Sequence, residues 1–193
     1  MANQNAPFGL RPIGKIGQNR DNQGLSEYSI KANDTTSIFF QDVVNATADG
    51  TVHLGAASEA FMVGSLNGVF FTDPTTSKPT FKNSYSQVNA SDIVAFVADD
   101  PYERFEIQSD NTLASAQTDV FNNFNLNVNT NTPSSANNVS TTQLDDSTVT
   151  TGTAQVKVTG VSTDIKNNDL SSSHVNFVVM INEHLYNAKN NGI

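Results

Sequence analysis

The chain contains no cysteine and no tryptophan among its 193 residues. Without cysteine it has no disulfide framework, no thiolate metal site and no thiol nucleophile. Hydrophobic residues are also scarce, at 37% of the chain. Asn, Ser and Thr take their place, and their side chains bond to nearby backbone groups in turns, caps and strand faces. This composition favours a β-rich, loop-rich protein that is stabilised by packing and by partners.

Long apolar runs and clustered positive charges are absent as well. No apolar run approaches the roughly 18 to 20 residues that a membrane span needs, and the first residues lack the basic cluster and apolar core of a signal peptide. We therefore expect a soluble chain with no membrane partner. Ten Lys and Arg residues face 19 Asp and Glu residues, for a net charge of −9. That balance argues against nucleic acid as a partner, because neutralising phosphates takes clustered cations.

Residues 1–26 are interrupted by two prolines and four glycines, so neither a helical nor a strand period persists there. We predict an extended amino-terminal arm. Its large apolar side chains would be buried on the chain's own body or on another subunit. The candidate residues for such an interface are Phe8, Leu10, Arg11, Ile13 and Ile16.

Charge adds a second argument about this arm. Residues 1–31 hold four cations against two carboxylates, a net of +2, which leaves −11 for the remainder. A mildly basic arm could dock onto an acidic protein surface. The alternative interpretation is that these few charges have no function.

Residues 27–193 are predicted to form a single β-rich domain. Two strand-like runs, 91–98 and 103–108, are joined by the turn residues Asp99-Asp100-Pro101. We expect them to be adjacent antiparallel strands, with Phe105 and Ile107 inside and Arg104, Glu106 and Gln108 facing water. Further hairpins are indicated by Ala48-Asp-Gly50 and by Asn67-Gly68.

The second half of the chain alternates between apolar strand patterns and polar segments. Residues 124–128 and 154–158 alternate with the period of a strand, and residues 177–181 are apolar on both faces, which is typical of a central strand. Between them, residues 129–153 are almost wholly polar and predict a long polar loop or a series of short edge strands. The predicted fold is all-β, a compact antiparallel β-barrel or β-sandwich with an extended amino-terminal arm.

No motif supplies catalytic, cofactor-binding or metal-binding residues. The carboxylates of Asp99, Asp100 and Glu103 could bind calcium, but Asp-Asp-Pro is ordinary turn chemistry and no EF-hand spacing completes the set. The three histidines are scattered, without the spacing of a zinc pair, and are interpreted as surface or strand-edge residues. No Gly-x-Ser-x-Gly elbow is present. We therefore expect a protein that is not an enzyme and has no cofactor.

Four motifs follow one another in the order found in a known family. They are Asn5-Ala-Pro-Phe-Gly-Leu-Arg-Pro12, Tyr28-x-Ile30, the Asp-Asp-Pro turn leading to Phe105-Glu-Ile-Gln108, and Ile181-Asn-Glu-His184. In this order the chain resembles the decoration, or cement, proteins of tailed-bacteriophage heads. The resemblance covers most of the chain and departs from the family in the Asn-rich segment 122–138.

The resemblance implies a non-enzymatic virion protein on the outer surface of the capsid. Such a protein, often a homotrimer, ties neighbouring subunits of the major capsid protein together against internal DNA pressure. The competing class is a β-sandwich module that binds glycans or host surfaces. That class should show a cleft with exposed aromatic side chains, and an enzyme is the third possibility.

Overall fold

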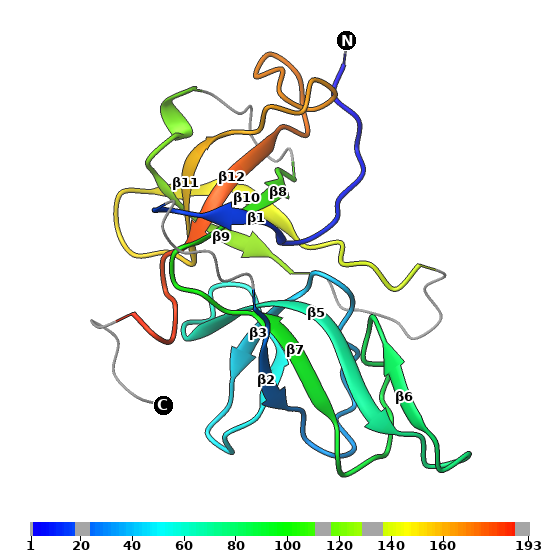
Figure 1. Ribbon diagram of the computed structural model, residues 1–193. Helices are drawn as coiled ribbons and strands as arrows, with labels where there is room; N and C mark the ends of the chain where they lie inside the picture. Colours follow the sequence, from blue (N-terminus) through cyan, green and yellow to red (C-terminus); the bar gives the residue numbers. More distant parts are fainter. Residues whose placement is uncertain (1, 18–23, 111–116, 129–136, 188–193) are drawn as a thin grey trace.

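The computed structural model describes residues 2–17, 24–110, 117–128 and 137–187. They form two antiparallel sheets that pack together in a sandwich-like arrangement (Figure 1). The predicted all-β class is therefore confirmed, and of the two predicted architectures the sandwich is the nearer, since no closed barrel forms among these residues. Their helical content is one 3-10 turn, η1 (Gln117–Asp119). Within the described ranges, no helix is long and apolar enough to cross a membrane.

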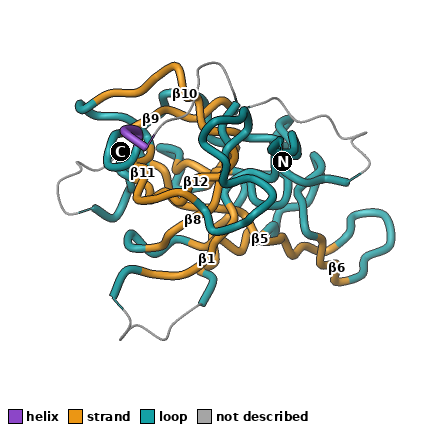
Figure 2. Tube along the Cα trace, turned by 90° about the horizontal axis from the view of Figure 1, so that it is seen from above, coloured by secondary structure: helices purple, strands orange, loops and turns teal. Residues whose placement is uncertain are grey.

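Sheet A has the strand order β1-β8-β12-β11-β9-β10. Its strands are β1 (Arg11–Lys15), β8 (Glu103–Gln108), β9 (Asn123–Asn127), β10 (Gln143–Thr150), β11 (Val156–Val161) and β12 (Asn176–Ile181). Seen from above, β8 and β12 lie between β1 on one side and β9 and β10 on the other (Figure 2). The apolar run at 177–181 is thus central, as predicted. Within the polar region predicted at 129–153, residues 143–150 form the edge strand β10, which agrees with the edge-strand alternative. Residues 129–136 of that region lie outside the described residues.

Sheet B has the order β2-β7-β5-β3-β4, with β6 paired to β5. Its strands are β2 (Ser26–Ser29), β3 (Val43–Ala46), β4 (Val52–Leu54), β5 (Met62–Thr72), β6 (Pro79–Lys82) and β7 (Val94–Ala98). The hairpin predicted at Ala48-Asp-Gly50 joins β3 to β4 and is confirmed. The hairpin predicted at Asn67-Gly68 is wrong, because both residues lie inside β5 at a shift of register against β7. A Cβ on Gly68 would lie 2.6 Å from the Phe81 ring, so glycine serves close packing there and not a turn.

The predicted pairing of residues 91–98 with 103–108 is also wrong. Strand β7 pairs with β2 and β5 in sheet B, whereas β8 pairs with β1 and β12 in sheet A. The Asp99-Asp100-Pro101 turn carries the chain from one sheet to the other (Figure 1). Phe105 and Ile107 are fully buried, as predicted, but Glu106 and Gln108 on the opposite face are buried as well and do not face water.

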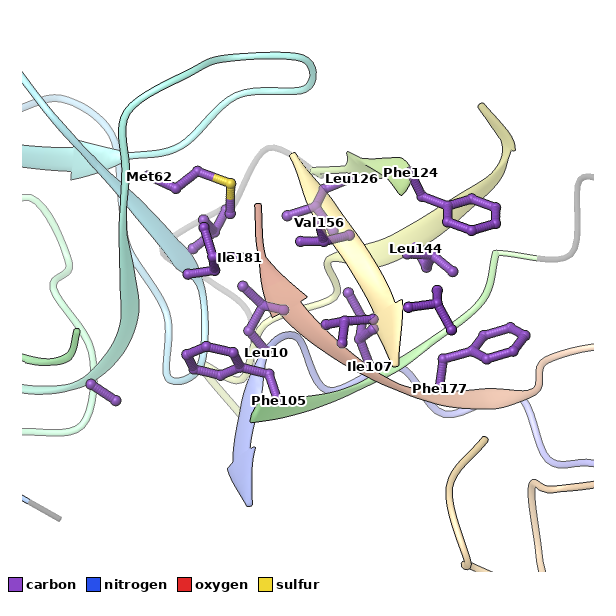
Figure 3. Packing of buried hydrophobic residues seen from close by; sticks show 14 of the residues in the cluster. Leu10, Met62, Phe105, Ile107, Phe124, Leu126, Leu144, Val156, Phe177 and Ile181 are labelled. Carbon is purple, nitrogen blue, oxygen red and sulfur yellow. The ribbon is translucent and has the colours of Figure 1, made fainter. Parts of the chain in front are cut away.

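Two apolar clusters hold the fold together. The larger one fills sheet A and also contains Val43, Met62 and Ala98 from sheet B. In Figure 3, Met62 reaches from β5 toward Ile181, beside Leu10 and Phe105. The second cluster lies within sheet B, around Tyr85, Phe71 and Leu66. Because the larger cluster draws residues from both sheets, their packing against each other depends on it.

We expect Phe105→Asp to lower the free energy of unfolding by about 3 kcal/mol or more, since it removes a buried ring and buries an unpaired charge. Phe121→Asp is the matched control, because the Phe121 side chain is 77% exposed. Urea unfolding followed by circular dichroism measures both. Equal stabilities of the two variants would contradict the burial of Phe105.

Candidate functional site at the junction of the two sheets

The amino-terminal segment, here residues 2–17, lies on the chain's own body and is not a free arm. Arg11–Lys15 form β1, which pairs with β8 at one edge of sheet A. Leu10 is fully buried within the larger apolar cluster. The prediction of a separate arm over residues 1–26 is corrected for residues 2–17, whereas residues 1 and 18–23 lie outside the described residues. Leu10 leaves the set of candidate interface residues. Leu10 is therefore buried on the chain's own body, which is one of the two outcomes expected from sequence.

Leu10 connects the two sheets through its backbone. Its N–H donates to the carbonyl oxygen of Gln41 at 2.9 Å, and its own carbonyl accepts from the Ser65 hydroxyl at 2.6 Å. Ser65 belongs to β5 of sheet B, and Gln41 lies two residues before β3 of the same sheet. The next residue, Arg11, begins β1 in sheet A. One residue therefore carries backbone bonds to sheet B and a side chain in the core of sheet A.

Gly9 is what allows this close approach. Its φ is +78°, and a Cβ at this position would lie 2.3 Å from the Gln41 carbonyl oxygen and 2.4 Å from the Ser140 Cβ. Real Cβ atoms do not approach other atoms that closely, and side chains larger than hydrogen disfavour this backbone conformation. Glycine is thus required for Leu10 to reach its site.

Carboxamide side chains hold the residues before Gly9. The Gln108 side chain accepts from the Ala6 N–H at 3.0 Å and donates to the Gln4 carbonyl at 2.9 Å. The Asn167 side chain also donates to the Gln4 carbonyl, at 2.8 Å. These bonds explain why Gln108, expected to face water, is buried: the amino-terminal segment covers it and satisfies its polar atoms.

The cations of the segment are paired within the chain. Arg11 lies 3.9 Å from the centroid of the half-buried Phe8 ring and 3.2 Å from the Glu106 carboxylate. Lys15 lies 2.9 Å from the Asp100 carboxylate. Arg11 and Lys15 therefore already have acidic partners on the chain's own body, and docking of a basic arm onto another acidic surface loses its main support.

Two of the predicted apolar interface residues remain at the surface. Ile13 is 45% exposed and Ile16 is 47% exposed, and Leu25 beside them is also exposed. Ile13 and Leu25 line a groove of about 340 Å³ whose floor includes Glu103. Burial raises the pKa of Glu103, an effect that the nearby Lys15 ammonium opposes. The junction thus presents an apolar edge beside β1.

Asp99, in the turn between the sheets, is the acceptor at the centre of a hydrogen-bond network. The Ser26 and Tyr28 hydroxyls donate to its two carboxylate oxygens. Because the Tyr28 proton is used in that bond, the Tyr186 hydroxyl donates to Tyr28, at 2.8 Å. Burial, followed by the bond to Asp99, raises the pKa of Tyr28, which keeps this phenol protonated.

The turn carboxylates therefore act structurally. The second carboxylate, Asp100, accepts from the Tyr102 N–H at 2.8 Å and pairs with Lys15. Among the described residues, no group of three His, Asp or Glu side chains is arranged to hold a metal ion. The calcium alternative for this turn consequently has no ligand set in this part of the chain.

His184 lies at the same junction and is 1% exposed, so its interpretation as a surface or edge residue is wrong. Its Nδ1 accepts from the Tyr186 N–H at 3.1 Å. Burial lowers the pKa of His184, and the Asp99 carboxylate only partly opposes this effect. The imidazole is therefore neutral near pH 7, with its proton on Nε2. His53, by contrast, lies on the edge strand β4, 3.3 Å from Glu59, as an edge residue should.

Sequence reasoning missed the polar networks at Asp99 and at Glu106. Glu106 accepts from the Ser162 hydroxyl, and this bond joins β8 to the residue that follows β11. The only signal for either network in the sequence is a polar residue within or beside a strand, which does not identify its partner.

No family model, curated protein or solved structure matches this chain.

We expect Gly9→Ala to destabilise the protein by more than Gly50→Ala does. Both glycines have a positive φ, which alone costs an alanine about 1 kcal/mol, but a Cβ on Gly50 meets nothing within 4 Å. The excess at Gly9 therefore reports the contact with Gln41 and Ser140. Thermal unfolding of both variants measures it, and equal melting temperatures would show that the Gly9 contact is not required.

Proposed function

We propose that this chain is a virion structural protein that binds the outer surface of a phage head and stabilises it by bridging subunits of the major capsid protein. The observation that carries the proposal is the apolar edge at β1, where Ile13 and Ile16 are exposed and Leu25 lines the same groove as Ile13. Ile13 and Ile16 lie within the same amino-terminal segment whose motif resembles that of head decoration proteins. The proposed role is one of binding and support, without catalysis.

The chemistry of this edge suits a protein partner. Strand β1 is an edge strand of sheet A, since within the described residues it pairs with β8 on one side and with no strand on the other. Exposed edge strands readily add a strand from another chain, and exposed apolar residues gain about 1.5 to 3 kcal/mol each when fully buried. Since Arg11 and Lys15 are paired internally, we expect apolar contact to dominate this interface.

The anchoring of the segment suits a cement role. A force applied at β1 would pass to sheet A through the pairing of β1 with β8, and to sheet B through the backbone bonds of Leu10. A load applied at this edge would be shared by both sheets. In the homotrimer that the family resemblance implies, three such edges would act together, and avidity would exceed the affinity of one edge.

The proposal predicts that Ile13→Asp combined with Ile16→Asp weakens binding to heads by about tenfold or more, because two apolar contacts become charged. Cosedimentation with heads that lack this chain measures the bound ratio. Both side chains are about half exposed, so the variant should keep its circular dichroism spectrum and melting temperature.

Phe121→Asp is the matched control for this experiment. Phe121 is 77% exposed and lies two residues before β9, which is separated from β1 by three strands of sheet A. This variant should bind heads like the parent chain. If the double variant cosediments as tightly as the parent, the β1 edge is not the contact. If the parent chain itself does not cosediment at a fixed ratio to the shell protein, the proposed function is wrong.

A further inference from the structure

A second groove lies on the other flank of the turn between the sheets. Its volume is about 330 Å³, within the range of small-ligand sites. It shares no lining residue with the groove beside β1. The side chains that matter for its chemistry are Tyr102, Lys157, Met180, Asn182, Tyr186 and Asn187.

Two aromatic rings dominate this groove. Tyr102 is 50% exposed and Tyr186 is 52% exposed, so both rings can reach a ligand. Tyr186 is also held in place: its hydroxyl bonds to Tyr28, its N–H bonds to His184, and its ring centroid lies 5.7 Å from that of His184. A ring fixed in this way loses little conformational entropy when a ligand stacks on it.

Polar groups surround the rings. The Asn182 amide is oriented by a bond from its Nδ2 to the Ala154 carbonyl, at 2.9 Å, and Lys157 is an exposed cation on β11. Amide and ammonium groups beside flat apolar rings match a ligand that has both a C–H face and a rim of hydroxyls. A few placed polar groups among apolar ones are the usual basis of orientation in small-ligand sites.

We propose that this groove binds a neutral saccharide. The C–H faces of a saccharide would stack on the Tyr102 and Tyr186 rings, and its hydroxyls would bond to the Asn182 and Asn187 amides and the Lys157 ammonium. A polyanion such as a nucleic acid fits less well, since the chain carries a net charge of −9 and Asp99 and Asp100 adjoin the groove. This site does not depend on the head-binding proposal, because its residues are distinct from those of the β1 edge.

The test uses the full chain and a defined set of neutral oligosaccharides, three to six residues long, of glucose, galactose, rhamnose and N-acetylglucosamine. Saturation-transfer NMR identifies a binder, and calorimetric titration gives its dissociation constant. Tyr102→Ala should weaken binding by about tenfold, as the loss of one stacked ring implies. Lys157→Gln, an exposed change that leaves the core intact, should weaken it by a smaller factor.

A control variant separates the site from non-specific stacking on exposed aromatic rings. Phe121→Ala removes an exposed ring that does not line the groove, and it should change nothing. The proposal is overturned if no oligosaccharide of the set binds at millimolar concentration. It is equally overturned if Tyr102→Ala and Lys157→Gln bind like the parent, or if Phe121→Ala weakens binding as much as Tyr102→Ala does.

Discussion

The structure depends on the insertion of Gly9 and Leu10 between the two sheets. Leu10 places its side chain in the core of sheet A while its backbone bonds to Gln41 and Ser65 of the sheet B half. Gly9 permits the approach because any Cβ would collide with the Gln41 carbonyl. With no cysteine in the chain, this junction relies on packing, hydrogen bonds and ion pairs. The segment that we propose contacts the capsid is therefore also a structural element of the body.

At the junction of the two sheets, hydrogen bonds of side-chain amides and hydroxyls replace the apolar contacts that a chain with more hydrophobic residues would use. Gln108 and Asn167 fix the backbone before Gly9, and Asp99 joins the turn between the sheets to Tyr28 and, through it, Tyr186. A buried polar group contributes only when it is paired, so these networks specify one arrangement of the segment and the turn. The low hydrophobic content and the abundance of Asn and Ser are thus consistent with the way the sheets are joined.

Local periodicity predicted much of this fold, and contacts distant in sequence account for what it missed. The alternation at 124–128 and 154–158, the central run at 177–181 and the burial of Phe105 all follow from side-chain direction along one strand. The Asn67-Gly68 error and the pairing assigned across Asp99-Asp100-Pro101 arose because turn residues also occur at bulges and at crossings between sheets. In the candidate site, Ile13 and Ile16 were predicted as interface residues, and both are exposed. The positions of Leu10, Tyr186 and His184 depend on contacts with residues distant in sequence, which no local pattern reveals.

Hydrogen exchange of the chain without residues 1–16 tests the central claim most directly. If the amino-terminal segment joins the sheets, amides of β3 in sheet B and of β12 in sheet A will both lose protection relative to the full chain, although neither strand pairs with β1. Loss of protection confined to β8, the partner of β1, would contradict the account, because β1 would then be only an added edge strand.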